Sequence, residues 1–386
     1  MTNKAYLLSM AVCAATALSA APVPNAVVEK AGAERITVSV STPPCAYTTA
    51  LKRNLQISGY FTLAKEGSIS VTGTPGASVA ASGRGKTITA TTPFGDDRSA
   101  RMAARRFADA MVKTFSDGGK GFATTRIAFI NRKGADNAEL YTCYPDGYDI
   151  RSLTSDGCAA VGPRWAPDGV NIYYTSFIHK FGNVFRINAE GGQRTQLAPF
   201  KGTATGAAVA PDGRRCAIIL SYQGNPELYV FDFGTRMVKR MTATLNAAEA
   251  SPCWSPDGSK IAYVSDQSRH PQVYILDVAT QKTSRFTNKG SENTNPDWSA
   301  DGKLVWASKR QGQTVLMVAD PAAGEASARA VTDPGSWEHP SWAADGRHVV
   351  ASRNKALFLV DTDPDADRPV QLFHNQGNWM NPSCSR

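Results

Sequence analysis

The stretch SPCWSPDGSKIAYVS, residues 251–265, decides the fold of this chain because it reads as a β-hairpin. Pro252–Trp254 can extend as a strand, and the β-branched and aromatic run Ile261–Val264 is typical of a second strand. Between them, Ser255–Gly258 favours a tight turn. In that turn Pro presets φ, Asp hydrogen-bonds its own backbone, and Gly accepts a positive φ.

The same Asp-Gly turn recurs along the chain at nearly constant spacing. Its glycines lie at positions 169, 213, 258, 302 and 346, at intervals of 44, 45, 44 and 44 residues. Four short strands recur around each turn. In the unit that begins at Ser251 they are Pro252–Trp254, Lys260–Ser265, Gln272–Leu276 and Thr283–Thr287. A period of this length with several strands per unit indicates a β-propeller, in which the blades stack radially.

Both ends of the repeat array are incomplete. Residues 126–154 supply a second, third and fourth strand but no first strand, whereas Asn381–Cys384 has the sequence of a first strand. We therefore predict that the carboxyl end pairs with the strand beginning at Arg126 and completes the sixth blade. The sequence predicts a mainly β chain in which residues 122–386 form a six-bladed β-propeller closed by its C-terminal strand.

Residues 22–121 lack the repeat and are predicted to form a small α/β domain that precedes the propeller. Strands are expected at Arg35–Val40, Ile69–Val71 and Thr87–Ala90, and a first helix at Ala46–Gln56. A second helix is expected over Arg98–Phe115, capped by the preceding aspartates and ended by a Gly-Gly pair.

Residues 1–21 are typical of an export signal. Lys4 is followed by the short apolar run Leu7–Cys13 and by small residues around Ala20. Lipid attachment at Cys13 is an alternative, although Val12 is large for the position before a lipidated Cys. We expect a mature protein that starts close to Ala21 and is free in the periplasm.

The composition excludes some partners and leaves the cysteines open. The formal net charge is +9, but the basic residues are scattered, so we expect no nucleic-acid partner. Six cysteines remain after the signal, and an oxidising compartment would allow 15 full pairings among which the sequence does not choose. They are Cys45, Cys143, Cys158, Cys216, Cys253 and Cys384.

No pattern in the sequence demands catalysis, a metal or a cofactor. Asp361–Asp367 resembles a calcium loop, but Ala366 and Leu372 stand where that loop needs Gly and Glu, so we expect a solvated turn. No Gly-x-Ser-x-Gly elbow, His-Glu-x-x-His helix or phosphate-binding Gly loop occurs. The repeated tryptophans are expected to pack between blades; they are Trp165, Trp254, Trp298 and Trp342.

Several segments resemble motifs of the TolB family, components of the Tol–Pal cell-envelope system. Gly119–Phe129 is similar to the family's Gly-x-Phe-x-Thr-x-Ile-Ala-Tyr link, and Leu55–Phe61 to its Asp-Leu-x-x-Ser-Gly-x-Phe motif. Glu139–Tyr141 with Asp146–Tyr148 resembles its first blade. The chain departs from the family in three respects. Its amino-terminal domain is short, and Asn54 replaces the Asp of the second motif. The family's helical Ala-His-x-x-Ser-Asp motif reads Ala104-Arg105-Arg106-Phe107-Ala108-Asp109 here.

The resemblance implies a non-catalytic, monomeric periplasmic scaffold that is peripheral to the membrane, maintains outer-membrane integrity and supports cell division. Its propeller would bind a Pal-like peptidoglycan-associated lipoprotein, and its amino-terminal tail a TolA-like inner-membrane protein. The tail contact is expected to include Glu34, Arg35 and Ile36, which resemble the start of the family's mature chain. The alternative is a secreted propeller hydrolase or glycan-binding protein, with its site assembled from separate loops.

We predict the lipoprotein site at one mouth of the propeller channel. The residues just before each innermost strand should ring that mouth, and two Trp and a Met beside carboxylates would form an amphipathic rim. The predicted rim residues are Glu249, Glu292, Asn293, Trp337, Glu338, His339, Trp379 and Met380. Two alternatives remain open: these are ordinary loop residues, with Trp379 packed under the closing strand, or Glu249, Glu292 and Glu338 hold a cation.

Overall fold

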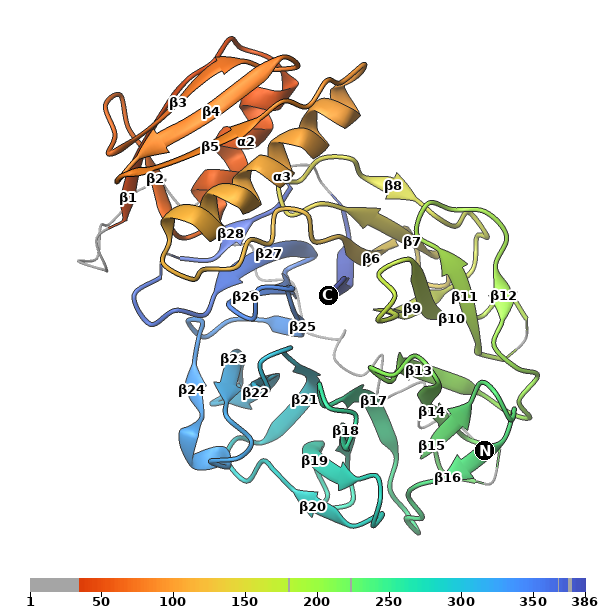
Figure 1. Ribbon diagram of the computed structural model, residues 1–386. Coiled ribbons are helices and arrows are strands. Elements are labelled where there is room, and N and C mark those ends of the chain that lie inside the picture. Colours follow the sequence, from red (N-terminus) through yellow and green to blue (C-terminus); the bar gives the residue numbers. More distant parts are fainter. Residues whose placement is uncertain (1–34, 180, 223, 367, 374–376) are drawn as a thin grey trace.

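A computed structural model describes residues 35–386 except 180, 223, 367 and 374–376. These residues form a propeller ring with a small α/β domain packed beside it (Figure 1). The predicted export signal and Glu34 lie outside the described residues. In the described part of the chain, no helix combines the length and the apolar character that crossing a membrane requires.

The amino-terminal domain is a five-stranded sheet covered by two helices (Figure 1). The strand order is β2-β1-β3-β4-β5, with β1 parallel to both of its neighbours. The predicted strands and helices are present, whereas β2 and β4 were not predicted. The elements are β1 (Ile36–Ser41), α2 (Ala46–Ile57), β2 (Phe61–Leu63), β3 (Ile69–Thr74), β4 (Ser78–Gly83), β5 (Lys86–Ala90) and α3 (Asp97–Phe115).

Helix α3 begins and packs as its sequence predicts. The Asp96 side chain accepts the backbone N–H of Ser99 at 2.7 Å, and the Ser99 side chain accepts the backbone N–H of Asp96, which forms a capping box. One face of the helix is buried through Ala103, Phe107 and Met111, which pack with Leu51 and Leu55 of α2 in the domain core. This apolar stripe fixes the face that α3 presents to the sheet.

The rest of the chain forms six four-stranded antiparallel blades arranged in a ring (Figure 1). From innermost to outermost strand, blade 1 is β29 (Trp379–Cys384), β6 (Ile127–Arg132), β7 (Ala138–Cys143) and β8 (Arg151–Ser152); blade 2 is β9 (Ala160–Trp165), β10 (Asn171–Ser176), β11 (Asn183–Asn188) and β12 (Thr195–Gln196); and blade 3 is β13 (Ala204–Val209), β14 (Arg215–Leu220), β15 (Glu227–Asp232) and β16 (Val238–Arg240). Blade 4 is β17 (Glu249–Trp254), β18 (Lys260–Ser265), β19 (Gln272–Asp277) and β20 (Thr283–Arg285); blade 5 is β21 (Glu292–Trp298), β22 (Leu304–Arg310), β23 (Gln313–Ala319) and β24 (Arg329–Ala330); and blade 6 is β25 (Trp337–Trp342), β26 (His348–Arg353), β27 (Ala356–Asp361) and β28 (Val370–Gln371).

The predicted closure of the ring by the carboxyl end is confirmed. Strand β29 pairs antiparallel with β6, with Trp379 opposite Asn131 and Cys384 opposite Ile127. The Trp379 ring packs on Phe129 at a centroid distance of 5.0 Å. The last strand of the chain therefore supplies the innermost strand of blade 1, and all six blades have four strands.

The repeated tryptophans pack between blades, as predicted. Trp254 of blade 4 lies in one cluster with Ile219 of blade 3, and its indole N–H donates to the Ala208 carbonyl at 2.9 Å. Trp342 packs in the same way against Val305 of blade 5. The six cysteines of the described residues, whose pairing the sequence leaves open, are all free thiols.

Candidate functional site

Every innermost strand carries a β-bulge that shapes the channel. The register against the next strand shifts once in each of the six pairs. At each bulge one residue has a left-handed φ between 50° and 63°. Glycine and asparagine tolerate this conformation best, and they occupy four of the six positions. The positions are Gly162, Gly206, Ser251, Asn295, His339 and Asn381.

The bulge sorts the residues of each innermost strand into two environments. The residue two positions before the left-handed bulge residue is buried in all six blades; Trp337 and Trp379 are examples. The bulge residue and the one before it are half-buried in all six, as for His339 and Glu338. The first position therefore packs between blades, and the next two line the channel. We call the face at which the innermost strands begin the channel-mouth face.

The two predicted rim tryptophans do not present an aromatic surface at the mouth, which corrects the sequence prediction. Trp337 is fully buried; its ring packs against Phe358 at 5.5 Å, and its indole N–H donates to the Asp333 carbonyl at 2.9 Å. Trp379 packs against Phe129 and Phe373 and belongs to the closing strand itself. Both residues lie within strands rather than before them, at the position that faces the neighbouring blade.

Three other predicted rim residues take part in local polar contacts. Glu249 is buried, accepts the Ser265 hydroxyl at 3.0 Å, and has its pKa raised to about 8 by burial and by the neighbouring Glu227 carboxylate. Asn293 is also buried and accepts the Trp306 indole N–H at 2.8 Å. Glu292 forms an ion pair with Lys309 at 3.0 Å. These contacts give each residue a structural role within its blade.

Glu338, His339 and Met380 are the predicted rim residues that line the channel. Burial raises the pKa of Glu338 to about 7, whereas burial and the nearby Arg164 lower the pKa of His339 to about 4. Near neutral pH the His339 ring is therefore uncharged. Among the described residues, no group of three or more His, Cys, Asp or Glu is arranged to hold a metal ion.

Large apolar side chains are exposed on the channel-mouth face, and the sequence prediction missed them. Phe181 is 53% exposed, Tyr222 46% and Leu245 93%. Phe181 and Tyr222 lie in loops between the second and third strands of blades 2 and 3, and Leu245 lies between blades 3 and 4. In these antiparallel blades such loops lie at the end where the innermost strands begin. The signal that could have found them is a large apolar residue in an otherwise polar loop.

A cavity lies at the opposite end of the channel, where the innermost strands end. Its volume is about 260 Å³, and its walls include Trp165, Trp254 and Pro256. The Arg164 guanidinium of blade 2 donates to Asp297 of blade 5 at 3.0 Å. Because these blades are three apart in a ring of six, the ion pair spans the channel from one side to the other. We call this space the far-end cavity.

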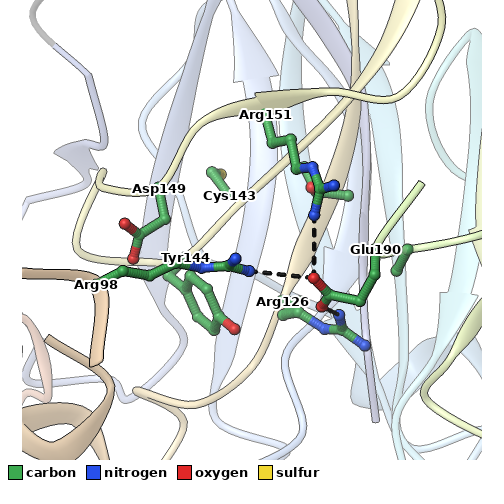
Figure 2. A pocket seen from close by; sticks show the side chains of 9 residues that line it. Arg98, Arg126, Cys143, Tyr144, Asp149, Arg151 and Glu190 are labelled. Carbon is green, nitrogen blue, oxygen red and sulfur yellow. Dashed lines mark hydrogen bonds and ion pairs between the residues drawn. The ribbon is translucent and has the colours of Figure 1, made fainter. Parts of the chain in front are cut away.

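A second polar cluster joins the amino-terminal domain to blades 1 and 2 (Figure 2). Glu190 accepts hydrogen bonds from Arg98 at 3.1 Å, Arg126 at 2.8 Å and Arg151 at 3.0 Å. The cavity among these side chains is about 20 Å³, which is room for a single water molecule. The cluster is therefore a contact between domains rather than a ligand site.

Comparison with known proteins places the chain in a family. The sequence profile described as the TolB beta propeller domain matches residues 116–386. The chain belongs to this family. Over 102 residues it is 34% identical to the Tol-Pal system protein TolB of Methylobacillus flagellatus, and this alignment covers 26% of this chain and 23% of that protein. Over 159 residues it is 30% identical to a TolB homolog of Chlorobaculum tepidum, and this alignment covers 41% of this chain and 36% of that protein. These alignments span about a quarter and about a third of the two relatives.

Solved structures share the fold. The crystal structure of TolB from Acinetobacter baumannii matches with a TM-score of 0.80 at 24% identity, over 92% of this chain and 98% of that one. A chain of a nidogen–laminin complex matches with a TM-score of 0.54 at 10% identity, over 68% of this chain and 98% of that one. The first match includes the amino-terminal domain.

Two of the departures from the TolB motifs, Asn54 and Arg105, meet at one carboxylate in the structure. The Arg105 guanidinium contacts Asp146 through two bonds of 2.8 and 2.9 Å, and also reaches Asp149 at 2.7 Å. Asn54 donates to the same Asp146 carboxylate at 3.0 Å. The side chains of Arg105 and Asp146 are fully buried, and the guanidinium stacks on the Tyr144 ring at 3.8 Å. These contacts tie α2 and α3 to the turn between β7 and β8.

Proposed function

We propose that this protein is a non-catalytic periplasmic scaffold of the Tol–Pal system, and that its channel-mouth face docks a Pal-like peptidoglycan-associated lipoprotein. The observation that carries the proposal is the group of exposed apolar side chains on that face, Phe181, Tyr222 and Leu245. Exposed aromatic and aliphatic residues surrounded by polar loops are typical of protein-binding hot spots. Family membership supports the same assignment.

The channel supports a binding role better than a catalytic one. Its titratable lining residues on the docking side are Glu338 and His339, which lie in a strand of blade 6. Nδ1 of His339 is buried without a hydrogen-bond partner among the described residues. Glu338, His339 and Met380 are therefore assigned to the inner edge of the docking surface, and the apolar loop residues to its outer part.

Titration with the soluble domain of the lipoprotein tests this docking surface. The double substitution Phe181→Ala and Leu245→Ala should weaken binding at least tenfold, because hot-spot side chains contribute about 2 kcal/mol each. Met237→Ala is the matched control, since Met237 is 70% exposed in blade 3 but lies in the turn between β15 and β16, on the opposite face. Wild-type affinity of the double variant would place the site elsewhere.

The same proposal assigns the amino-terminal tail to a TolA-like inner-membrane protein. Arg35 precedes β1, and the Ile36 N–H donates to the Tyr60 carbonyl at 3.2 Å, so the tail is joined directly to the sheet. Removing residues 22–34 should abolish binding to the rod domain of that protein and leave the melting temperature unchanged. Unchanged rod binding would reject this contact. Mass spectrometry of the exported protein tests the start near Ala21; a lipid on Cys13 would contradict it.

A further inference from the structure

The far-end cavity contains more hydrogen-bond donors than the carboxylate of Asp297, which lines it, can accept. Oδ1 of Asp297 accepts from Arg164 at 3.0 Å and from Arg386 at 3.1 Å. Its Oδ2 accepts the Ser341 hydroxyl at 3.2 Å and the Trp342 N–H at 2.8 Å. A carboxylate offers about four acceptor positions, so Asp297 is saturated.

The two guanidinium groups are not saturated. Each guanidinium has five N–H donors. Arg164 also donates to the Pro296 carbonyl at 3.4 Å, and Nη2 of Arg386 also donates to the Trp298 carbonyl. Nε of Arg164, and Nε and Nη1 of Arg386, have no acceptor among the described residues. Their side chains are 21% and 36% exposed, so these donors can be reached by a ligand.

Most of the other residues that line the cavity are apolar, and Ser341 and Ser383 are polar. Trp165 and Trp254 contribute indole surface, and Val209, Pro211 and Pro256 contribute aliphatic surface. The guanidinium fork matches a planar carboxylate through paired hydrogen bonds, and a flat apolar group can pack against indole and proline rings. A volume of about 260 Å³ is near the lower end of ligand pockets, which favours a small molecule.

We propose that the far-end cavity binds a small organic carboxylate, with its anionic group on Arg164 and Arg386 and its apolar body between Trp165 and Trp254. The cavity lies at the opposite end of the channel from the docking surface, so this site is separate from the proposed lipoprotein contact and does not depend on it. The cavity is formed by the closed ring, because Ser383 and Cys384 of the closing strand also line it.

Nuclear magnetic resonance of the tryptophan indole groups tests the site in the full-length protein. The Trp165 indole N–H donates to the Ser383 carbonyl at 3.0 Å, and the Trp254 indole N–H donates to the Ala208 carbonyl at 2.9 Å, so both report on the cavity wall. Benzoate should shift both signals saturably at concentrations below about 10 mM, as expected for so small a ligand. Benzamide and sulfate should each bind at least tenfold more weakly.

Matched variants separate the cavity from general charge effects. Arg386→Gln should weaken benzoate binding at least tenfold while the melting temperature stays close to wild type, because Asp297 keeps Arg164, Ser341 and Trp342. Arg215→Gln should bind benzoate as the wild type does. Arg215 lies over the Trp254 ring at 5.0 Å but does not line the cavity. The proposal would be overturned if benzoate gave no saturable shift of the indole signals, or if benzamide or sulfate bound as tightly as benzoate. It would also be overturned if Arg386→Gln and Arg215→Gln lost benzoate affinity equally.

Discussion

Arg105 and Asn54 share one buried partner, Asp146, at a domain junction. An Asp at position 54, as in the TolB motif, would place its carboxylate against that of Asp146. Asn54 instead donates to Asp146 at 3.0 Å, and Arg105 neutralises the same buried carboxylate. These two departures from the family motifs therefore serve one contact. The sequence shows each change separately, but only the fold brings the two residues to the same partner, 92 and 41 positions further along the chain.

Replacing Arg105 by Ala should destabilise the protein strongly. The change leaves Asp146 fully buried without its guanidinium partner, and removing one member of a buried ion pair costs about 3–5 kcal/mol. Arg98→Ala is the control, because Arg98 and Glu190 are both more than half exposed and such pairs contribute up to about 1 kcal/mol. Urea unfolding of both variants measures the difference. Similar losses in the two would show that Asp146 does not depend on Arg105.

Glu249 should make stability depend on pH. Its pKa is about 8 in the folded protein, against about 4.3 in an unfolded chain. Between these values the folded state binds more protons, so the free energy of unfolding falls as pH rises. Glu249→Gln removes this loss, and its stability relative to wild type should increase by roughly 2 kcal/mol or more from pH 5 to pH 8. The contributions of groups that titrate in both proteins cancel in the stability difference between the variant and wild type. If urea unfolding gives the same difference at every pH in this range, the raised pKa of Glu249 is contradicted.

Among the elements, β29 is the one on which the ring depends. Deleting residues 381–386 removes half of its ladder with β6 and exposes part of the inner edge of β6. We expect a loss of about 3 kcal/mol or more and aggregation on heating. Deleting only Ser385 and Arg386 keeps every β29–β6 pair and should be much milder. Calorimetry and light scattering compare the two; equal melting of the longer deletion and wild type would refute the closure model.

The elements that the sequence predicts are those with a strong local signal. The Asp-Gly turns and alternating strands locate the blades, and the capping residue Asp96 locates α3. Strand β2 is only three residues long and β4 is rich in Ala, Ser and Gly, so neither has a clear pattern. The rim prediction was wrong for Trp337 and Trp379 because it took the strands to begin after these residues. In the sequence the bulge shows only as a residue before Pro in five blades and before Ala in the sixth, and that residue is Gly or Asn in four of them.

At the scale of the whole molecule, the amino-terminal domain spans the seam where the ring closes. One apolar cluster joins Ile57 at the end of α2 and Phe122 of the domain link to Phe129 of blade 1 and Leu357 of blade 6. Phe122 also stacks on the buried His348 of blade 6 at 4.2 Å. Blades 1 and 6 are the two that the carboxyl end brings together (Figure 1). The domain therefore stabilises the junction that the closing strand creates.

The ion pair between Arg164 and Asp297 connects opposite sides of the ring and should couple blades 2 and 5. A double-mutant cycle with Arg164→Met and Asp297→Asn isolates this pair from the other contacts of Asp297. Because Asp297 is only 3% exposed, we expect a coupling energy of about 1–3 kcal/mol. The surface pair of Arg215 with Asp212, 31% and 38% exposed, is the matched control and should couple by less than about 1 kcal/mol. Urea unfolding of the four proteins in each cycle gives both energies. Equal coupling in the two cycles would mean that the contact across the channel adds no more to the stability of the ring than a contact within one turn.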